Sequence, residues 1–236
     1  VDTSTRAEKV AWIMNKYDLI VLPVINTEKQ LVGRITIDDV VDVMKEEAEK
    51  DYQMASGISD NIEPLGSVWS LTRARIPWLI IGMIGGLLGA QIIGLFKIEE
   101  NPLLAFFIPL ITAMGGNVGV QSSAIIVQGL AANNLGMDHW SKRLIKEFSV
   151  ALVNGLICCI ILFIICMLLY PQPSIPITVS ISLLTVMIFA ALFGTFIPLI
   201  LNKNNIDPAL ATGPFITTMN DVIGLFIYFS IAKLML

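Results

Sequence analysis

The chain has 236 residues, of which 55% are hydrophobic and only 14% are charged, and its net charge is −4. A soluble domain is normally about a quarter charged, so this composition excludes an ordinary soluble protein and predicts a membrane protein. The charges are also segregated, because residues 1–75 hold 13 acidic and 9 basic side chains while residues 76–236 hold 6 of each. We therefore expect a soluble, acidic first part and an embedded second part.

The first part has the pattern of a small α/β unit. Helical periodicity over residues 5–16 is followed by a buried strand over 19–25, a turn at 26–29 and a second strand over 31–36. From Ile37 the pattern becomes helical again and continues past Asp51. This order predicts a helix, a hairpin and a second helix, a unit too small to fold alone.

Uncharged segments long enough to cross a bilayer, which takes about twenty residues for a helix, follow from residue 76 onward. Residues 148–202 contain no charge over 55 residues, so this run must form two spans, separated by the proline-rich turn at 171–176. We predict five transmembrane helices, at about 76–96, 102–130, 148–170, 177–201 and 208–235. The expected fold is an all-α membrane protein preceded by a partial α/β module.

The basic residues indicate how these spans are oriented. With the first part in the cytoplasm, only Lys97 and Lys233 lie at outer positions, and all others lie inside: Arg73, Arg75, Lys142, Arg143, Lys146 and Lys203. The positive-inside rule then predicts a cytoplasmic N-terminus and an outer C-terminus. We expect a multi-pass protein of the cell membrane, which in a two-membrane cell is the inner membrane.

One acidic residue, Asp221, lies far from both ends of the fifth span. A carboxylate at membrane depth is costly unless it faces water or a cation, so this residue is a candidate for ion binding. A two-fold dimer would place two copies of Asp221 opposite each other on a central axis. The alternative is a carboxylate that makes a helix-packing hydrogen bond.

The neighbours of Asp221 favour a path for a hard cation, because such ions prefer oxygen ligands. Gly213 and Pro214 can loosen the helix upstream and free backbone carbonyls. Magnesium holds its first-shell water tightly and would bind through that water. The candidate pore-metal residues are Asp221, Thr217, Thr218 and Asn220.

The second span carries an unusual set of small and polar residues over 109–123. Gly116 and two further glycines occur there with Asn117 and Gln121, which lie one turn apart on a single helix face. This pattern indicates a broken or closely packed helix that lines a polar path. A helix interface built from small residues is the alternative, and the sequence leaves both open.

The helix after Ile37 is strongly acidic, with seven acidic and two basic residues over 38–51. Most such helices are simply solvated. Like charges at helical spacing repel, however, and a divalent cation that bridges them relieves the repulsion. The segment is therefore either a solvated face or a cation sensor.

The chain resembles the MgtE family of magnesium channels. The resemblance rests on Pro109, on the run 115–121, on Asp207-Pro208-Ala209, on Gly213-Pro214 and on 217–221. Residues 21–24, 31–36 and Asp39 also resemble the closing half of a CBS module, which the family carries in tandem before its membrane domain. We expect residues 1–37 to be this part of a CBS module, 38–62 a connecting helix and 63–236 the pore domain.

The resemblance implies a homodimer of five-span protomers, with a pore lined by the second and fifth helices and hydrated Mg²⁺ at Asp221. It also implies that the connecting helix is a plug that closes the inner mouth when cytosolic Mg²⁺ is high. The pore-lining residues expected from it are Asn117, Gln121, Gly116, Gly213 and Pro214. The expected regulatory metal residues are Asp39, Asp42, Glu46, Glu47 and Asp51. The family's N-terminal domain and first CBS module are absent from this sequence.

In CBS modules of the family, a threonine and an aspartate three residues later can hold a nucleotide ribose, and Thr36 and Asp39 match that pattern. The resemblance therefore implies ATP as a ligand of the intact CBS region. Its partner module is not part of this sequence.

Two classes of transport fit these residues. A passive magnesium channel needs no proton gradient, whereas a secondary transporter coupled to protons or sodium would exchange one of these ions at Asp221. An enzyme is not expected, because the spans contain no His-Glu-x-x-His motif, no paired aspartates and no serine with a histidine partner. We expect the lipid bilayer, a second copy and divalent cations as partners, and no nucleic acid.

Overall fold

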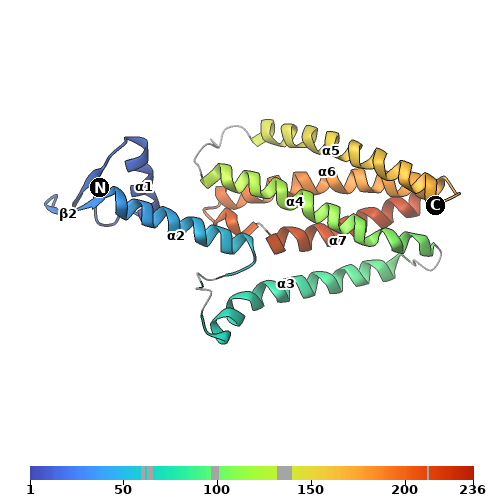
Figure 1. The fold of residues 1–236 in the computed structure, drawn as a ribbon, viewed down its shortest axis with the longest axis horizontal. Coiled ribbons are helices and arrows are strands. Elements are labelled where there is room, and N and C mark those ends of the chain that lie inside the picture. Colours follow the sequence, from blue (N-terminus) through green and yellow to red (C-terminus); the bar gives the residue numbers. More distant parts are fainter. Residues whose placement is uncertain (60–61, 63–65, 97–100, 132–139, 212) are drawn as a thin grey trace. The chain divides into compact units, whose positions relative to one another are not determined.

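The computed structural model describes residues 1–59, 62, 66–96, 101–131, 140–211 and 213–236 (Figure 1). It divides into two compact units, Val1–Gln53 and Met54–Leu236. The first unit contains a two-stranded sheet, and the second is a bundle of long helices (Figure 1).

The first unit has the predicted order of helix, hairpin and helix: α1 (Ala7–Lys16), β1 (Val21–Ile25), β2 (Leu31–Thr36) and the greater part of α2 (Ile37–Ala55). The strands are antiparallel, with Val21 paired to Thr36. The two helices and the sheet meet around a small apolar core, in which Met14 is fully buried. The other core residues are Val10, Ala11, Leu22 and Val40.

Helix α2 continues past Asp51, as expected, and ends at Ala55, within the expected connecting segment 38–62. Gly57 has a φ of 77°, which lies in the left-handed region that favours glycine and stops a helix. Residues 60 and 61, at the end of the expected connecting segment, lie outside the described residues.

Among its described residues, the second unit contains five helices that are long and apolar enough to cross a membrane: α3 (Val68–Leu95), α4 (Ile108–Ala131, with the preceding 3-10 turn η2, Pro102–Phe107), α5 (Trp140–Leu169), α6 (Ser174–Lys203) and α7 (Gly213–Met235). This confirms the prediction of an all-α membrane protein with five spans. Helix α3 begins eight residues before the predicted span, because the Ser67 hydroxyl accepts the Ser70 N–H and caps it.

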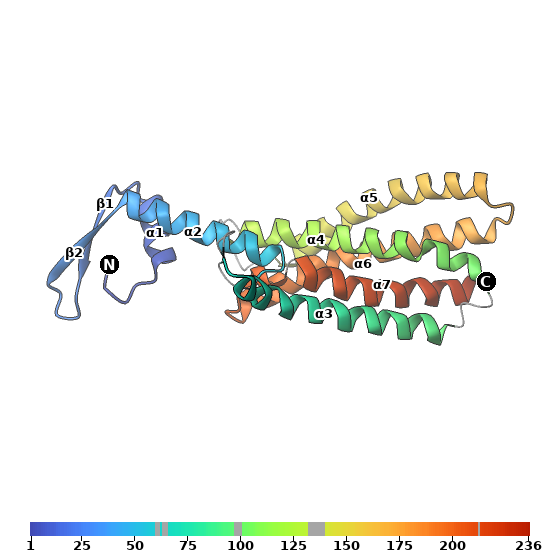
Figure 2. The ribbon, with the colours of Figure 1, turned by 60° about the horizontal axis from the view of Figure 1, so that its bottom comes forward.

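Helix α6 lies at the centre of the bundle, where α4, α5 and α7 pack against it (Figures 1 and 2). Helix α3 lies at the edge and packs mainly on α7. Towards the end of the bundle formed by η2, a large apolar cluster surrounds Met187, Tyr228 and Phe229. The buried Tyr228 hydroxyl donates to the Leu104 carbonyl at 2.9 Å, which ties α7 to η2.

Away from this cluster, glycines allow α4 and α6 to approach each other closely. A Cβ on Gly194 would lie 2.3 Å from the Gly119 carbonyl oxygen, so α6 and α4 touch through their backbones. Helix α4 is continuous through this region. The helix at 109–123 is therefore closely packed and not broken, and its small residues form an interface with α6.

Candidate functional site

Asp221 lines a cavity of about 270 Å³ between α3, α4 and α7. One wall is a small-residue face of α3, and the others carry two threonine hydroxyls and the carboxylate. The lining residues are Gly82, Gly85, Gly86, Gly89, Ala90 and Ile93 of α3, Thr112 of α4, and Thr218, Asp221 and Leu225 of α7. The candidate acid and a candidate hydroxyl, Thr218, therefore share one cavity.

Glycines let the surrounding helices approach this carboxylate. A Cβ on Gly85 would lie only 2.0 Å from Thr218 Cγ2, so α3 can reach α7 only without a side chain there. On the opposite side, a Cβ on Gly116 would lie 3.9 Å from Asp221 Oδ1 and 3.5 Å from Thr217 Cγ2. Gly116 thus lies beside Asp221 with room for a Cβ, whereas Gly85 has none.

The half-buried Asp221 carboxylate has no hydrogen bond or ion pair with any residue that the structure describes. The helix-packing hydrogen bond considered as the alternative is thus not formed within the described part of the chain. The same residues contain no group of three or more His, Cys, Asp or Glu side chains that could hold a bare metal ion. One carboxylate beside hydroxyls in a cavity suits a cation that keeps its water shell.

Thr112 is a cavity residue that the sequence did not single out. Its hydroxyl donates to the Ile108 carbonyl at 3.1 Å, which leaves the oxygen's lone pairs as acceptors on the cavity side of α4. A threonine in an apolar span is ordinary, and only the packing of α4 beside α7 reveals its place near Asp221. No sequence signal would have distinguished it from Thr178 or Thr185.

Asn220 does not line this cavity. Its side chain is 1% exposed and faces Gly119 of α4, where a Cβ would lie 1.9 Å from the Asn220 amide nitrogen. Neither amide atom has a hydrogen-bond partner among the described residues. The structure thus brings Thr218 and Asp221 together and separates Asn220 from them.

Thr217 is half-buried, and its hydroxyl donates back to the carbonyls of Gly213 and Pro214 at 3.2 and 3.1 Å. These two residues lie at the start of α7 and not inside it. Gly213 has a φ of 48°, and a Cβ there would lie 2.1 Å from the Ala55 carbonyl oxygen. Gly213 and Pro214 thus begin a helix that is regular through Asp221, and the expectation that they loosen the fifth span and free backbone carbonyls stays a prediction.

Asn117 and Gln121 lie on the exposed face of α4, as their spacing predicts. On the buried side of the same helix, the Ser122 hydroxyl donates to Glu147 of α5 at 2.5 Å. The sequence gave no sign of this pair, because it depends on which faces of α4 and α5 meet. A charge-assisted hydrogen bond of this kind holds the two helices in register.

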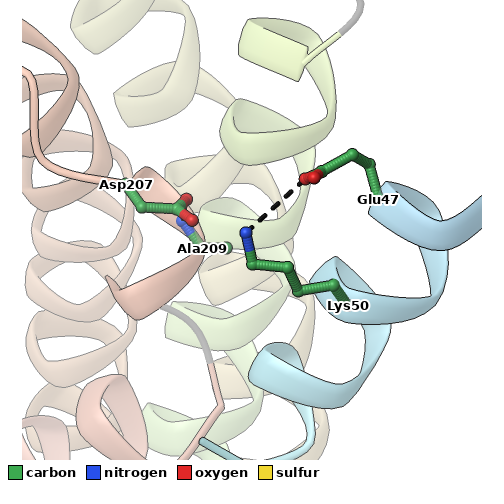
Figure 3. Close-up of polar contacts among 4 residues, drawn as sticks. All are labelled: Glu47, Lys50, Asp207 and Ala209. Atoms are coloured by element: carbon green, nitrogen blue, oxygen red, sulfur yellow. Dashed lines mark hydrogen bonds and ion pairs between the residues drawn. The ribbon is translucent and has the colours of Figure 1, made fainter. Parts of the chain in front are cut away.

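The acidic residues of α2 are mostly exposed. The Lys50 ammonium pairs with the Glu47 carboxylate at 3.6 Å (Figure 3), and Lys45 lies 3.9 Å from Glu49. Asp42 and Glu46 are exposed on the same helix, and Asp51 is half-buried.

In the second unit, Asp207 caps the 3-10 turn η4 (Pro208–Ala211) by accepting the Ala209 N–H at 2.9 Å (Figure 3).

Thr36 and Asp39 form the start of α2. The Asp39 carboxylate accepts the Thr36 N–H at 2.8 Å and the Thr36 hydroxyl at 2.7 Å. These two hydrogen bonds lower the pKa of Asp39, the backbone one contributing most. The pair that the resemblance links to a nucleotide therefore has a capping role here.

Residues 108–231, which include α4 to α7 and the candidate site, match the MgtE family, described as divalent cation transporters. The chain belongs to the MgtE family. This confirms the resemblance found in the sequence. The family's description is of a transporter and not an enzyme, in agreement with the absence of a catalytic motif.

Curated members of the MgtE family align with nearly the whole chain. "Magnesium transporter MgtE" of Thermus thermophilus is 36% identical over all of this chain and 53% of its own length. The protein of the same name in Bacillus subtilis is 34% identical over 95% of this chain and 50% of its own. That of Enterococcus faecalis is 32% identical over 96% and 50%. The chain spans about half the length of these relatives.

Proposed function

We propose that the chain forms, as a homodimer, the pore of a magnesium-selective channel in the cell membrane. The observation that carries this proposal is the Asp221 carboxylate, which lines a cavity inside a membrane bundle without a protein partner among the described residues. Such a charge at membrane depth is stabilised by water or by a cation. A divalent ion that arrives with its water shell supplies both.

Magnesium is the proposed ion because it exchanges first-shell water reluctantly and is held through carboxylates and water. A single Asp221, with the oxygens of Thr112 and Thr218, offers outer-sphere contacts rather than a complete cage. The names of the curated relatives support the same ion. Whether other divalent cations bind the same site is tested by their competition with Mg²⁺ flux.

The homodimer is supported by the outer face of α4. Asn117 and Gln121 are exposed there on a helix that is otherwise apolar enough to lie in lipid. Side-chain amides facing hydrocarbon are costly, whereas a second copy across a polar path would hydrate or bind them. We propose that α4 and α7 of two protomers line the pore.

The proposed orientation has the N-terminus in the cytoplasm and the C-terminus outside. Lys203 Nζ lies 5.6 Å from the centre of the Trp140 ring, so the end of α6 and the basic start of α5 share one end of the bundle. Lys142, Arg143 and Lys146 belong to that same start of α5. Lys233 lies near the opposite end of α7, and Lys97 is outside the described residues.

We propose that α2 senses cytosolic Mg²⁺ and closes the pore. The exposed carboxylates of Asp42 and Glu46 support binding of a bridging cation, since neither has an ion pair among the described residues. The first unit, as the end of a CBS module, would contribute Thr36 and Asp39 to an ATP site completed by a partner module. In that state Asp39 would exchange its Thr36 contacts for the ribose.

Magnesium uptake into liposomes that contain the purified chain tests the proposal. A channel gives flux that follows the Mg²⁺ gradient and the voltage, and Asp221→Ala abolishes it. Flux that depends on an imposed proton or sodium gradient at fixed voltage would instead establish a coupled transporter. A mutant that conducts as well as the parent would refute the role of Asp221.

A further inference from the structure

A second cavity, of about 550 Å³, lies within the bundle unit at the end where α3 and α7 begin. Its walls come from the segment that precedes α3, from the first turns of α3 and from the start of α7. The residues that matter here are Ser56, Ile58, Arg75, Trp78, Leu79 and Pro214. Apart from Pro214, which the family resemblance implies as pore-lining, none of these residues has a role in the functions proposed above.

Residues 56–59, which lie before α3 in the chain, are held against both helices and so form a defined wall. The Ser59 N–H donates to the Ala74 carbonyl at 3.0 Å, which holds the segment on α3. A Cβ on Gly57 would lie 2.6 Å from Pro214 Cγ, which means that this residue is pressed against the start of α7. The cavity is thus a built feature of the fold.

Besides the Ser56 hydroxyl, two donor side chains line the cavity. Arg75 brings a guanidinium that has no acidic partner among the described residues. The indole nitrogen of Trp78 is shielded from solvent and has no hydrogen-bond partner there either. No described carboxylate lines the cavity. The unpaired charge of Arg75 favours an anion that accepts from both groups, and a phosphate oxygen pair matches the fork of an arginine.

The rest of the lining is apolar, through Ile58, Leu79 and Pro214. Arg75 immediately precedes the uncharged run that begins at Ile76, so the cavity lies where a polar interface meets hydrocarbon. Tryptophan is typical of that depth because its ring is apolar and its N–H is polar. A small inorganic anion would use only the donors, whereas an amphiphile uses the whole surface.

We propose that this cavity binds the phosphate group of an anionic phospholipid, with Arg75 and Trp78 as its donors and the apolar wall against the glycerol and upper acyl chains. Basic pockets between membrane helices are suited to lipid headgroups. The first turn of α7, where Pro214 lies, adds to the attraction for the phosphate because it carries the positive end of the helix dipole.

Native mass spectrometry of the full chain released from detergent tests this proposal by titration with phosphatidylglycerol. Arg75→Gln should weaken binding roughly tenfold, because it removes the charged donor from the cavity. Arg73→Gln is the matched control, since Arg73 is exposed two residues earlier on the same helix and does not line the cavity. Trp78→Phe, which keeps a ring but removes the N–H, should also weaken binding, and Trp69→Phe should not.

Two further ligands separate the sources of phosphate. Diacylglycerol, which lacks the phosphate, should bind far more weakly, and inorganic phosphate should not displace phosphatidylglycerol. If Arg75→Gln and Arg73→Gln lose phosphatidylglycerol binding equally, the lipid is attracted by surface charge in general and the proposed site is overturned. If inorganic phosphate at equal concentration displaces phosphatidylglycerol, the proposal that the ligand is a lipid is overturned. The Trp78→Phe comparison decides the matter if Arg75→Gln fails to fold.

Discussion

Asn220 and Asp221 are adjacent in the chain, but their side chains enter different surroundings. Asn220 is buried against Gly119 of α4, whereas Asp221 lines the cavity shared with Thr112 and Thr218. Successive residues on an α-helix are about 100° apart, which is enough to direct one side chain into a helix contact and the next into a cavity. The two residues should therefore behave differently when they are changed.

Asp221→Asn keeps the shape of the side chain and removes its charge. We expect Mg²⁺ flux in liposomes to fall by more than about tenfold, because the attraction for a hydrated divalent ion is lost. Asn220→Ala should leave most of the flux, once it is corrected for the amount of folded protein. Similar losses in the two variants would place Asn220 in the ion path and contradict this separation.

Thr112→Val removes the hydroxyl that α4 contributes to the cavity and keeps a branched side chain. We expect the flux to fall about threefold to tenfold, because one outer-sphere oxygen is replaced by a methyl group. Thr185→Val is the matched control, since Thr185 makes the same kind of hydrogen bond, to Ile181 at 2.9 Å, on an exposed face of α6. An unchanged flux in Thr112→Val would remove Thr112 from the site.

Gly194→Ala should destabilise the bundle. The new Cβ would lie 2.3 Å from the Gly119 carbonyl oxygen, and a backbone atom cannot rotate away. Overpacking of this kind costs about 1–3 kcal/mol, which should lower the midpoint of thermal unfolding in detergent. Gly94→Ala is the control, because nothing lies within 4 Å of its added Cβ. Equal midpoints for the two variants would contradict the backbone contact.

Asp39→Asn should loosen the first turn of α2. The hydrogen bonds from Thr36 lower the pKa of Asp39 below its ordinary value of 3.8, so the contact stabilises the helix start above about pH 4. That contribution is lost as the pH falls through the lowered pKa. Amide hydrogen exchange at Thr36 and over residues 41–44, corrected for intrinsic rates, should show weaker protection at pH 7 in Asp39→Asn than in Asp42→Asn. Equal protection would contradict the capping role.

The double variant Asp42→Asn, Glu46→Gln tests the regulatory proposal. If these exposed carboxylates bind the inhibitory cation, their loss should raise the Mg²⁺ concentration that half-closes the channel by roughly tenfold. Glu49→Gln is the control, because Glu49 already pairs with Lys45. A half-closing concentration that does not move would leave these residues as a solvated face.

The five spans could be predicted because hydrocarbon excludes charge, and a run such as 148–202 admits no other reading. The ends of the helices could not be predicted in the same way, because they depend on local capping interactions. Helix α3 starts at Val68, within a polar segment, through a single hydrogen bond to Ser67. Helix α2 stops early because Gly57 takes a left-handed conformation, and no charge or proline marks that point.

The sequence predicts those parts of the site that follow from the energetic cost of burying a charge. It does not predict those that depend on the direction in which a side chain points from its helix. Asp221 stands out in the sequence because an acid is expensive in a span. Thr112, and the pairing of Ser122 with Glu147, depend on which helix faces meet, and apolar spans show almost no periodicity that would reveal this. Asn220 was grouped with its neighbour by type, although its position on the helix directs it elsewhere.

The place of α3 at the edge of the bundle has a mechanical consequence. Helices α4 and α6 are locked by the backbone contact of Gly119 with Gly194, whereas α3 meets α7 through the glycine face that ends at Gly89. A tilt of α3 would therefore change the width of the cavity beside Asp221 and leave the backbone contact between α4 and α6 in place.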